Sequence, residues 1–598
     1  MDRALEAHLR GAEILFSLMM AKMDKQIMTS ILPYISPKDH VVIDYASKMF
    51  ATLQKLRNII GQCAVYLLSP NFLEVLDEQI ALLQTDEYRP HNTLPQKIAI
   101  KFSHERKDRY IVLYNSLGHS RTELVKVVVT SPSVIVKDSS ENVIPCQINP
   151  VFKKRKMVEG EFELLFYAEL PAMSLVTYSI HVVGTEHSIS QRAVLKFMNS
   201  ELTRSSQEFL MVHLDPQDQF TIKSDYITAY FNGTNGLLKK ITSVNVDAEL
   251  DLQIKFLKYG TKTKGKDKSG AYLFLPDSDA KEVDYNSPEV IILEGPLMSE
   301  VIVMLKEVEH HIILKNSPGF DGAGIEIYNL INIATETNKE LIMRFITNLT
   351  NEKQEFYTDL NGLQALFKKV PLQGNVYPVT TMAYFEDNST RFTFLTSHSL
   401  GAACLQPGWF EVFLDRRLNQ DDNRGLQQGI TDNKETPVYF RILLEQRSLH
   451  FKNLPFQEVS RYPSLLAHQA SLALLHPVFV LVRLDKDAEP NIVFYATLPT
   501  ISGTLFLPSN SSALFLHRLG FDCNFKTWGH SQHRMELDVL AELCESFLVS
   551  VANLFPNLFG SSVEEVSLSL MYTGSKFSRD AQIQLPPMEI VTLRLSQR

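Results

Sequence analysis

The spacing of apolar residues changes once along the chain, near Gln96. Before this point apolar residues recur at alternating steps of three and four, which places one apolar stripe along a helix. Three stretches follow this rule, and they run from Leu5 to Met23, from Val42 to Leu67 and from Phe72 to Leu83. We therefore expect a three-helix bundle over residues 1–92.

After Gln96 the apolar period becomes two, as expected for half-buried strands. Strands are expected over Lys97 to Phe102, Tyr110 to Tyr114 and Val125 to Val129, with a hairpin formed by Glu163 to Leu170 and Leu175 to Val183. Few tracts are long enough for crossover helices, so the sheets should be antiparallel. The pattern predicts an α+β, mostly β chain with a first β-sandwich domain at residues 93–190, a large β-super-sandwich domain at 205–455 and a C-terminal β domain at 460–598.

Length and composition are those of an ordinary globular protein with several domains. The chain has 598 residues, 45% hydrophobic and 21% charged, and a formal net charge of −9. No basic cluster favours nucleic acid as a partner. The first residues do not resemble a signal peptide, and no apolar run is long enough for a transmembrane segment. We expect neither a signal peptide nor a membrane anchor in this chain.

The cysteines and the glycosylation sequons give little information about function. The five cysteines are widely spaced without a Cys-x-x-Cys pair, so we expect no cysteine zinc site. Four N-x-Ser/Thr sequons permit glycosylation in a secretory compartment, and they begin at Asn232, Asn348, Asn388 and Asn510.

The densest charged stretch lies between Asp415 and Gly429. Three arginines and three aspartates follow an apolar strand that ends at Leu414. The pattern indicates a strand end with a cluster of bidentate ion pairs. Two interpretations stay open: the charges brace one another at a sheet edge, or they form a rigid polar rim beside a pocket for a hydroxyl-rich ligand.

Other candidate residues favour structural roles. His310 and His311 are adjacent on a strand, so they face opposite sides and cannot easily bind one metal. Asp359 is expected to cap its own turn. Asp421 and Asp422 are surrounded by arginines that should keep both ionised, which makes them poor general acids. We assign no catalytic residue.

Several ungapped blocks together resemble one known family across nearly the whole chain. The first is Asp415-Arg416-Arg417-Leu418 with the following Gln-Asp-Asp-x-Arg-Gly-Leu. The others, in chain order, are Asp267 to Asp277, Phe356 to Gly362, Tyr377 to Tyr384, Arg461 to His468 and Leu516 to Cys523. They resemble the C-terminal part of glycoside hydrolase family 38, in its Golgi α-mannosidase II branch.

The resemblance implies a zinc-dependent retaining α-mannosidase that trims mannose from N-glycans in the Golgi lumen. It also implies that Tyr272 and Arg417 bind substrate hydroxyls. The α/β domain that carries the nucleophile and most zinc ligands in the family has no counterpart in this sequence. The His-His-Asp block of the family is replaced by Met28 to Asp39. We therefore assign no metal ligand and expect the chain to be inactive alone.

Two alternatives remain beside this interpretation. A truncated relative can serve as a glycan-binding or scaffold module without hydrolysis, with an N-glycan or mannose oligosaccharide as its partner. Alternatively, the chain is part of a normal enzyme whose upstream residues, and a segment near Ser30 to Lys38, are missing from this sequence. The resemblance further implies a disulfide at Cys523, for which Cys544 is a displaced candidate partner.

Overall fold

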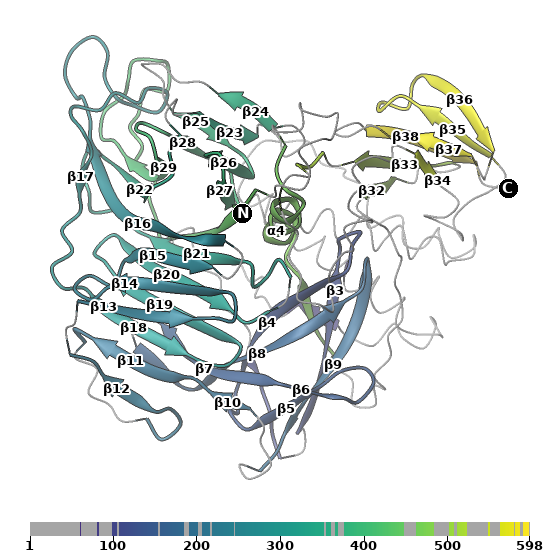
Figure 1. Ribbon diagram of the computed structural model, residues 1–598, viewed down its shortest axis with the longest axis horizontal. Coiled ribbons are helices and arrows are strands. Elements are labelled where there is room, and N and C mark those ends of the chain that lie inside the picture. Colours follow the sequence, from purple (N-terminus) through teal and green to yellow (C-terminus); the bar gives the residue numbers. More distant parts are fainter. Residues whose placement is uncertain are drawn as a thin grey trace.

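The computed structural model describes residues 99–447 and 462–483, with gaps at 105–106, 154–155, 185–189, 201–205, 216–217, 244–245, 318, 352–354, 360–364 and 369–375. It also describes Ile60, Ile80–Leu82, 501–506, 511–518, 520–522, 525, 548–550, 562–578, 581–585 and 590–596. Over these residues the protein is mostly β, with sandwich-like sheets (Figure 1).

The expected N-terminal three-helix bundle is not supported. Ile60 is helical and buried, but most of residues 1–92 lie outside the described part of the chain. Where the third helix was expected, Ile80–Leu82 instead form strand β1, which pairs antiparallel with β31 (Phe479–Arg483). A short apolar run is compatible with either a helix or a strand. Here the free edge of β31 supplies the hydrogen-bond partners that favour a strand.

Two sheets form the first sandwich. In the first sheet β1 and β31 are followed by β3 (Asp108–Asn115), β9 (Ser174–Val182), β5 (Val134–Lys137) and β6 (Val143–Ile144). The order in the second is β10 (Gln191–Arg192), β7 (Cys146–Lys153), β8 (Lys156–Leu170), β4 (Arg121–Val129) and β2 (Ala99–Ile100). Pairing is antiparallel except for β10 with β7 and β2 with β4.

The expected hairpin at residues 163–183 is wrong, although both of its strands exist. β8 pairs with β4 and β7, whereas β9 pairs with β3 and β5 of the opposite sheet. The connection crosses between the sheets because other groups hold it: Met173 N donates to Leu117 O at 2.8 Å, and Asn115 Nδ2 donates to Pro171 O at 2.7 Å. Alternation predicts a strand but not its partner.

A larger sandwich follows, built from two long sheets. The first has the order β12 (Met211–His213), β11 (Val194–Met198), β18 (Glu289–Glu294), β19 (Met298–Met304), β20 (Val308–Lys315), β21 (Gly324–Ile331), β30 (Thr436–Gln446), β27 (Thr390–Thr396), β26 (Met382–Glu386), β23 (Phe356–Asp359) and β24 (Ala365–Lys368). The second has the order β13 (Gln219–Lys223), β14 (Ile227–Asn232), β15 (Leu238–Ser243), β16 (Val246–Gly260), β22 (Lys339–Thr347), β29 (Trp409–Arg417), β28 (Leu400–Ala403) and β25 (Tyr377–Val379), and β17 (Lys281–Glu282) pairs with β16.

One hydrophobic core joins these two sheets. Phe345 of β22 meets Phe392 and Phe394 of β27, with ring centroids 5.5 and 5.6 Å apart. All seven residues of β19 are buried, because its second face packs on the first sandwich through Ile302. The expected antiparallel arrangement is confirmed for these strands except β11 and β12, which pair in parallel.

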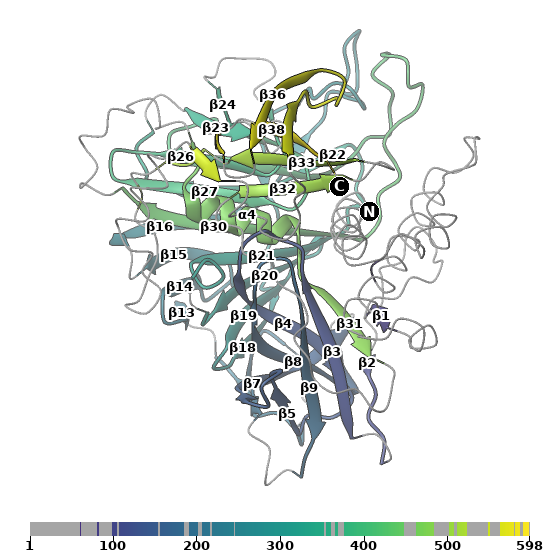
Figure 2. The ribbon, with the colours of Figure 1, turned by 90° about the vertical axis from the view of Figure 1, so that its right-hand side faces the viewer.

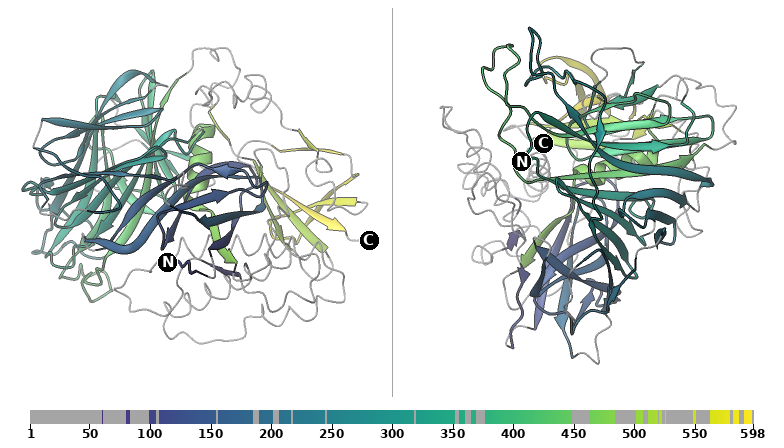
Figure 3. Two further views of the ribbon diagram at one scale, coloured as in Figure 1. Left: turned by 90° about the horizontal axis from the view of Figure 1, so that it is seen from below. Right: turned by 90° about the vertical axis from the view of Figure 1, so that its left-hand side faces the viewer.

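Helix α4 (Leu465–Leu475) lies where the sandwiches and the C-terminal sheet meet (Figures 2 and 3). Its N-cap, Ser464, accepts a hydrogen bond from Ala467 N at 3.0 Å. Its apolar side packs on the first long sheet, and His468 Nε2 lies 2.8 Å from Gly520 O. This helix was not expected, since the region after residue 460 was predicted to be β-rich.

The C-terminal sheet has the order β32 (Ile501–Phe506), β33 (Ser511–Arg518), β38 (Ile590–Ser596), β35 (Ser562–Val566) and β36 (Thr573–Ser578). A separate pair is formed by β34 (Leu548–Ser550) and β37 (Gln582–Gln584). Before this sheet the chain returns to the first sandwich, where β31 pairs with β3 (Figure 2). The expected cysteine pair at positions 523 and 544 lies outside the described residues.

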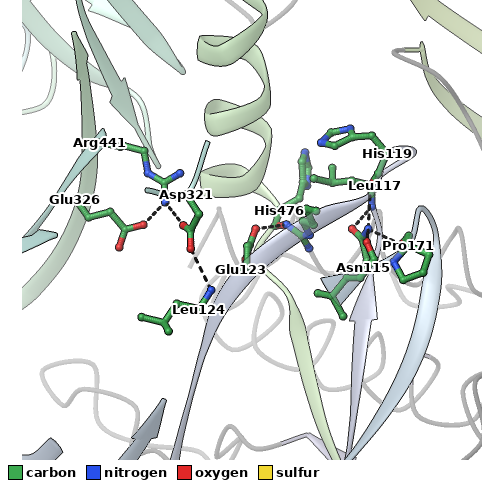
Figure 4. A network of polar contacts seen from close by, with 12 residues as sticks. Asn115, Leu117, His119, Glu123, Leu124, Pro171, Asp321, Glu326, Arg441 and His476 are labelled. Carbon is green, nitrogen blue, oxygen red and sulfur yellow. Dashed lines mark hydrogen bonds and ion pairs between the residues drawn. The ribbon is translucent and has the colours of Figure 1, made fainter. Parts of the chain in front are cut away.

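A buried polar network joins the two sandwiches (Figure 4). Asp321 accepts hydrogen bonds from Leu124 N at 3.0 Å and from Lys315 Nζ and Arg441 Nη2 at 2.8 and 2.9 Å. Arg121 Nη1 donates to the carbonyl that ends α4, at His476. Such charges are tolerated in the interior because each has opposite charges and hydrogen bonds around it.

Candidate functional site

The charged stretch begins where β29 ends against β22. Arg417 lies opposite Lys339 and Arg416 opposite Glu340, and an irregular register between Leu341 and Ile342 redirects the end of the strand. The chain then leaves the sheet and returns through paired hydrogen bonds between Leu418 and Ile430, at 3.0 and 2.7 Å. We name residues 419–429 the acid loop.

A second loop lies against the acid loop. It follows β16 and is closed by a bridge between Thr261 and Pro276. Within it, Ser269 binds both the N–H and the carbonyl of Leu275 through its hydroxyl, at 2.8 and 2.7 Å. We name residues 262–275 the tyrosine loop, because its Tyr272 is 64% exposed.

Asp422 connects the two loops. Its carboxylate is fully buried and accepts hydrogen bonds from Tyr272 N at 2.7 Å, Leu273 N at 3.0 Å and Arg424 N at 3.2 Å. Burial raises the pKa of this carboxyl, but the backbone donors outweigh it and hold the pKa below its ordinary value. Gly270 packs directly on Asp422, where an added Cβ would lie 2.5 Å from the aspartate Cβ.

Arg416 fastens the same loops from the strand side. Its Nη2 donates to Glu340 Oε1 at 2.9 Å and to Leu273 O at 3.3 Å, and its Nη1 donates to Ala271 O at 3.3 Å. Gln420 adds a bond to Ser269 O at 2.9 Å. Burial raises the pKa of Glu340, and Arg416 lowers it only in part.

Arg417 takes a different direction. Its Nη1 donates to Thr431 O and Asn433 Oδ1, both at 3.1 Å. Asn433 in turn donates to Asp415 Oδ2 at 3.0 Å and to Arg416 O at 2.9 Å. Of the two residues expected to bind substrate, Tyr272 therefore lies on the tyrosine loop, and Arg417 lies at the base of the acid loop.

The predicted ion pairs within the charged stretch are wrong. Arg416 pairs with Glu340 on β22, and Arg424 pairs with Asp267 of the tyrosine loop at 3.0 Å. Asp422 is held ionised by backbone N–H groups rather than by arginines. The side chains of Arg416, Asp422 and Arg424 therefore bind the neighbouring tyrosine loop rather than one another. Sequence reasoning missed Glu340, because a strand residue 76 positions away gives no local signal.

The two adjacent histidines lie on opposite faces of β20, as predicted. His310 is buried near Asn329, with 2.6 Å between Nδ1 and Oδ1, and burial lowers its pKa to about 4. His311 lies between Glu300 and Glu309, at 2.6 and 3.0 Å; burial lowers its pKa, but the carboxylates outweigh this and raise it to about 9.

Asp359 connects its own strand to the start of β26. Its carboxylate accepts hydrogen bonds from Thr381 N and Oγ1, both at 2.9 Å, and from Met382 N at 3.0 Å. It therefore caps the start of β26, which lies beside its own strand β23, whereas the turn that it was expected to cap, at residues 360–364, lies outside the described residues.

No group of three or more His, Cys, Asp or Glu that could hold a metal ion occurs among the described residues. In the same part of the chain, no helix has the length and apolar character that crossing a membrane requires.

Comparison with known proteins places these loops in a family. The family described as "Glycosyl hydrolases family 38 C-terminal domain" matches residues 222–424, which include both loops up to Arg424. Alpha-mannosidase 2 of Mus musculus is 33% identical over 100% of this chain and 55% of its own length. Alpha-mannosidase 2x of Mus musculus is 34% identical with the same coverage.

A solved structure shows the same fold. A protein in glycosyl hydrolase family 38 from Enterococcus faecalis aligns with 99% of this chain and 70% of its own, with a TM-score of 0.55 and 12% identity. The chain spans about half the length of the curated relatives it matches. It therefore belongs to glycosyl hydrolase family 38, of which it contains an α-mannosidase II-like C-terminal region.

Proposed function

We propose that this chain forms the substrate-binding C-terminal region of an α-mannosidase II-like retaining glycosidase that trims α-mannose from N-glycans in the Golgi lumen. The names of the relatives support the mannosidase activity. The Golgi lumen and the N-glycan substrate come from the family resemblance.

The observation that carries the proposal is the interlocked pair of loops. They hold Tyr272 and Arg417 on one rigid frame, with the phenol exposed and its backbone fixed by Asp422. A phenol and a guanidinium can donate to sugar hydroxyls, and the phenol can also accept. A preorganised frame loses little conformational entropy when a sugar binds.

Hydrolysis requires two suitably placed carboxylates, and none is assigned here. Asp422 is committed to backbone donors, and Glu340 is committed to Arg416. The zinc of the parent family finds no set of three ligating side chains among the described residues, so no reaction step is assigned to it. We expect the chain alone to bind mannose-containing glycans without turnover.

Two measurements test the proposal. Purified residues 1–598 should show no mannosidase turnover, and a rate that a chelator abolishes would contradict the proposed inactivity. Titration with a high-mannose N-glycan oligosaccharide should detect binding that weakens in Tyr272→Phe and Arg417→Ala. Tyr572→Phe is the matched control, because Tyr572 is 72% exposed on the remote C-terminal sheet. No binding by the wild type would refute the glycan site.

A second candidate is an independent glycan-binding module that never takes part in hydrolysis. It is favoured by one observation: among the described residues, the hydrogen bonds that fix both loops come from residues 261–433. Joining the chain to a family 38 catalytic domain distinguishes the candidates. Turnover of the joined protein that falls in Tyr272→Phe supports the enzyme, whereas unchanged turnover supports the module.

A further inference from the structure

We propose that Asp422 is the positioning residue of the glycan site, acting through the backbone of Tyr272. The inference rests on the proposed function, because it assumes that the Tyr272 phenol contacts a sugar. It assigns to a buried carboxylate the task of orienting a side chain that solvent surrounds.

The burial of Asp422 is the first observation. None of the ion pairs between described residues includes Asp422, so this buried negative charge is balanced by backbone N–H donors rather than by a cation. A buried charge of this kind is costly unless its hydrogen bonds are complete. A neutral residue would support a simple loop contact equally well, so the cost indicates a requirement for strong, fixed hydrogen bonds.

The arrangement of the donors is the second observation. One oxygen, Oδ2, accepts from the successive amides of Tyr272 and Leu273, while Oδ1 accepts from Arg424 N in the acid loop. Fixing two successive amides fixes the peptide plane before and after the Tyr272 Cα atom, and hence the direction of its Cβ atom. The Tyr272 side chain is 64% exposed and has little packing that could orient it.

The fit of Gly270 is the third observation. Gly270 N donates to Leu273 O at 3.0 Å, which closes a tight turn around Tyr272. The absent Cβ of Gly270 leaves space for Asp422, whose backbone N would lie only 2.6 Å from such an atom. The turn, Gly270 and the Asp422 carboxylate pack together as one unit, and the phenol of Tyr272 projects from this unit into solvent.

A double-mutant cycle tests the proposal, with affinity for a high-mannose N-glycan oligosaccharide as the readout. We expect Asp422→Ala and Tyr272→Ala each to weaken binding about tenfold, since each removes one strong polar contribution. The double variant should bind no more weakly than Tyr272→Ala, because Asp422 acts only through the tyrosine. A loss that multiplies in the double variant would show an independent role and overturn the proposal.

Two variants separate positioning from folding. Asp138→Ala is the matched control, because Asp138 likewise accepts backbone N–H groups, those of Ser140 and Asn142, but in a turn of the first sandwich, and it should bind as the wild type does. Asp422→Asn keeps one carbonyl oxygen for the Tyr272 and Leu273 amides but loses the charge and the acceptor for Arg424 N, so its affinity should lie between those of the wild type and Asp422→Ala.

Amide hydrogen exchange provides a readout that does not depend on ligand. Asp422→Ala should speed exchange at Tyr272 and Leu273, while the amides of β22 keep their protection. Unchanged exchange at these two amides would overturn the proposal even if affinity falls. Absence of binding by the wild type refutes the proposed function, and the inference with it, whereas wild-type binding that Asp422→Ala leaves unchanged refutes the inference alone.

Discussion

Replacing Arg391 with alanine tests how the C-terminal segment is attached to the large sandwich. Arg391, on β27, is completely buried. Its Nε donates to Glu386 at 2.7 Å, its Nη2 to Asp522 at 2.9 Å and its Nη1 to Tyr462 O at 3.0 Å. One guanidinium therefore joins the β26–β27 hairpin to two residues that follow in the chain by 71 and 131 positions.

The expected loss in the free energy of unfolding follows from the groups that Arg391→Ala would leave without their partner. Asp522 is fully buried and would lose its guanidinium partner, which costs about 3–5 kcal/mol for a buried pair. The guanidinium carbon also lies 4.1 and 4.0 Å from the ring centroids of Tyr384 and Phe525, and losing these contacts adds about 1 kcal/mol. We expect the free energy of unfolding to fall by about 4 kcal/mol or more.

Urea unfolding followed by circular dichroism measures this loss. With a slope of about 3 kcal/mol/M, the midpoint of the affected transition should fall by more than about 1 M. Arg424→Ala is the control: its pair with Asp267 is about half-exposed on both sides and should contribute less than about 1 kcal/mol. If Arg391→Ala lowers the midpoint no more than Arg424→Ala does, the buried pair does not hold the segment.

Three further predictions rest on single positions. Gly270→Ala should lower the melting temperature by several degrees, while Gly574→Ala, whose added Cβ meets nothing closer than 3.4 Å, should not; equal shifts would contradict the packing argument. Two carboxylates outweigh burial and raise the pKa of His311 to about 9. The protonated side chain therefore contributes at most roughly 3 kcal/mol to the free energy of unfolding. This contribution is fully present below pH 6.5 and is lost as the pH rises through 9. The urea midpoint should fall over this range in the wild type and much less in His311→Gln, and parallel curves would refute this. In a secretory host, peptide mapping should find glycan on exposed Asn388 and not on half-buried Asn232, whose side-chain oxygen binds two backbone amides; the reverse occupancy would refute this.

The existence of several strands was predictable, although their burial does not alternate strictly. The sequence located β3, β4, β8 and β9, yet the last five residues of β3 and the first seven of β9 are all buried. Their partners were not predictable, since pairing depends on contacts between distant segments. Helix α4 was missed although Ser464 is a good N-cap, because its short sequence is apolar on every side and shows no helical stripe.

The sequence predicted where the candidate site lies along the chain but not the contacts within it. The density of charges around Arg416 marked the loops, and the resemblance selected Tyr272 and Arg417. The role of Asp422 depends on amides 149 and 150 positions earlier, which no local pattern reveals. Sequence spacing suggested arginines as its partners, but the Gly270 turn brings N–H groups closer.

The position of β31 constrains the order in which the domains of this protein can be completed during synthesis on the ribosome. The first sandwich places β31 beside β3, yet β31 ends at Arg483 and the last of the other long strands, β9, ends at Val182. Translation at about 5–20 residues per second separates these points by on the order of 15–60 s. During that interval the β3 edge has no β31 to cover it, and an open edge can pair with other chains. The whole large sandwich must emerge before the domain that precedes it is complete.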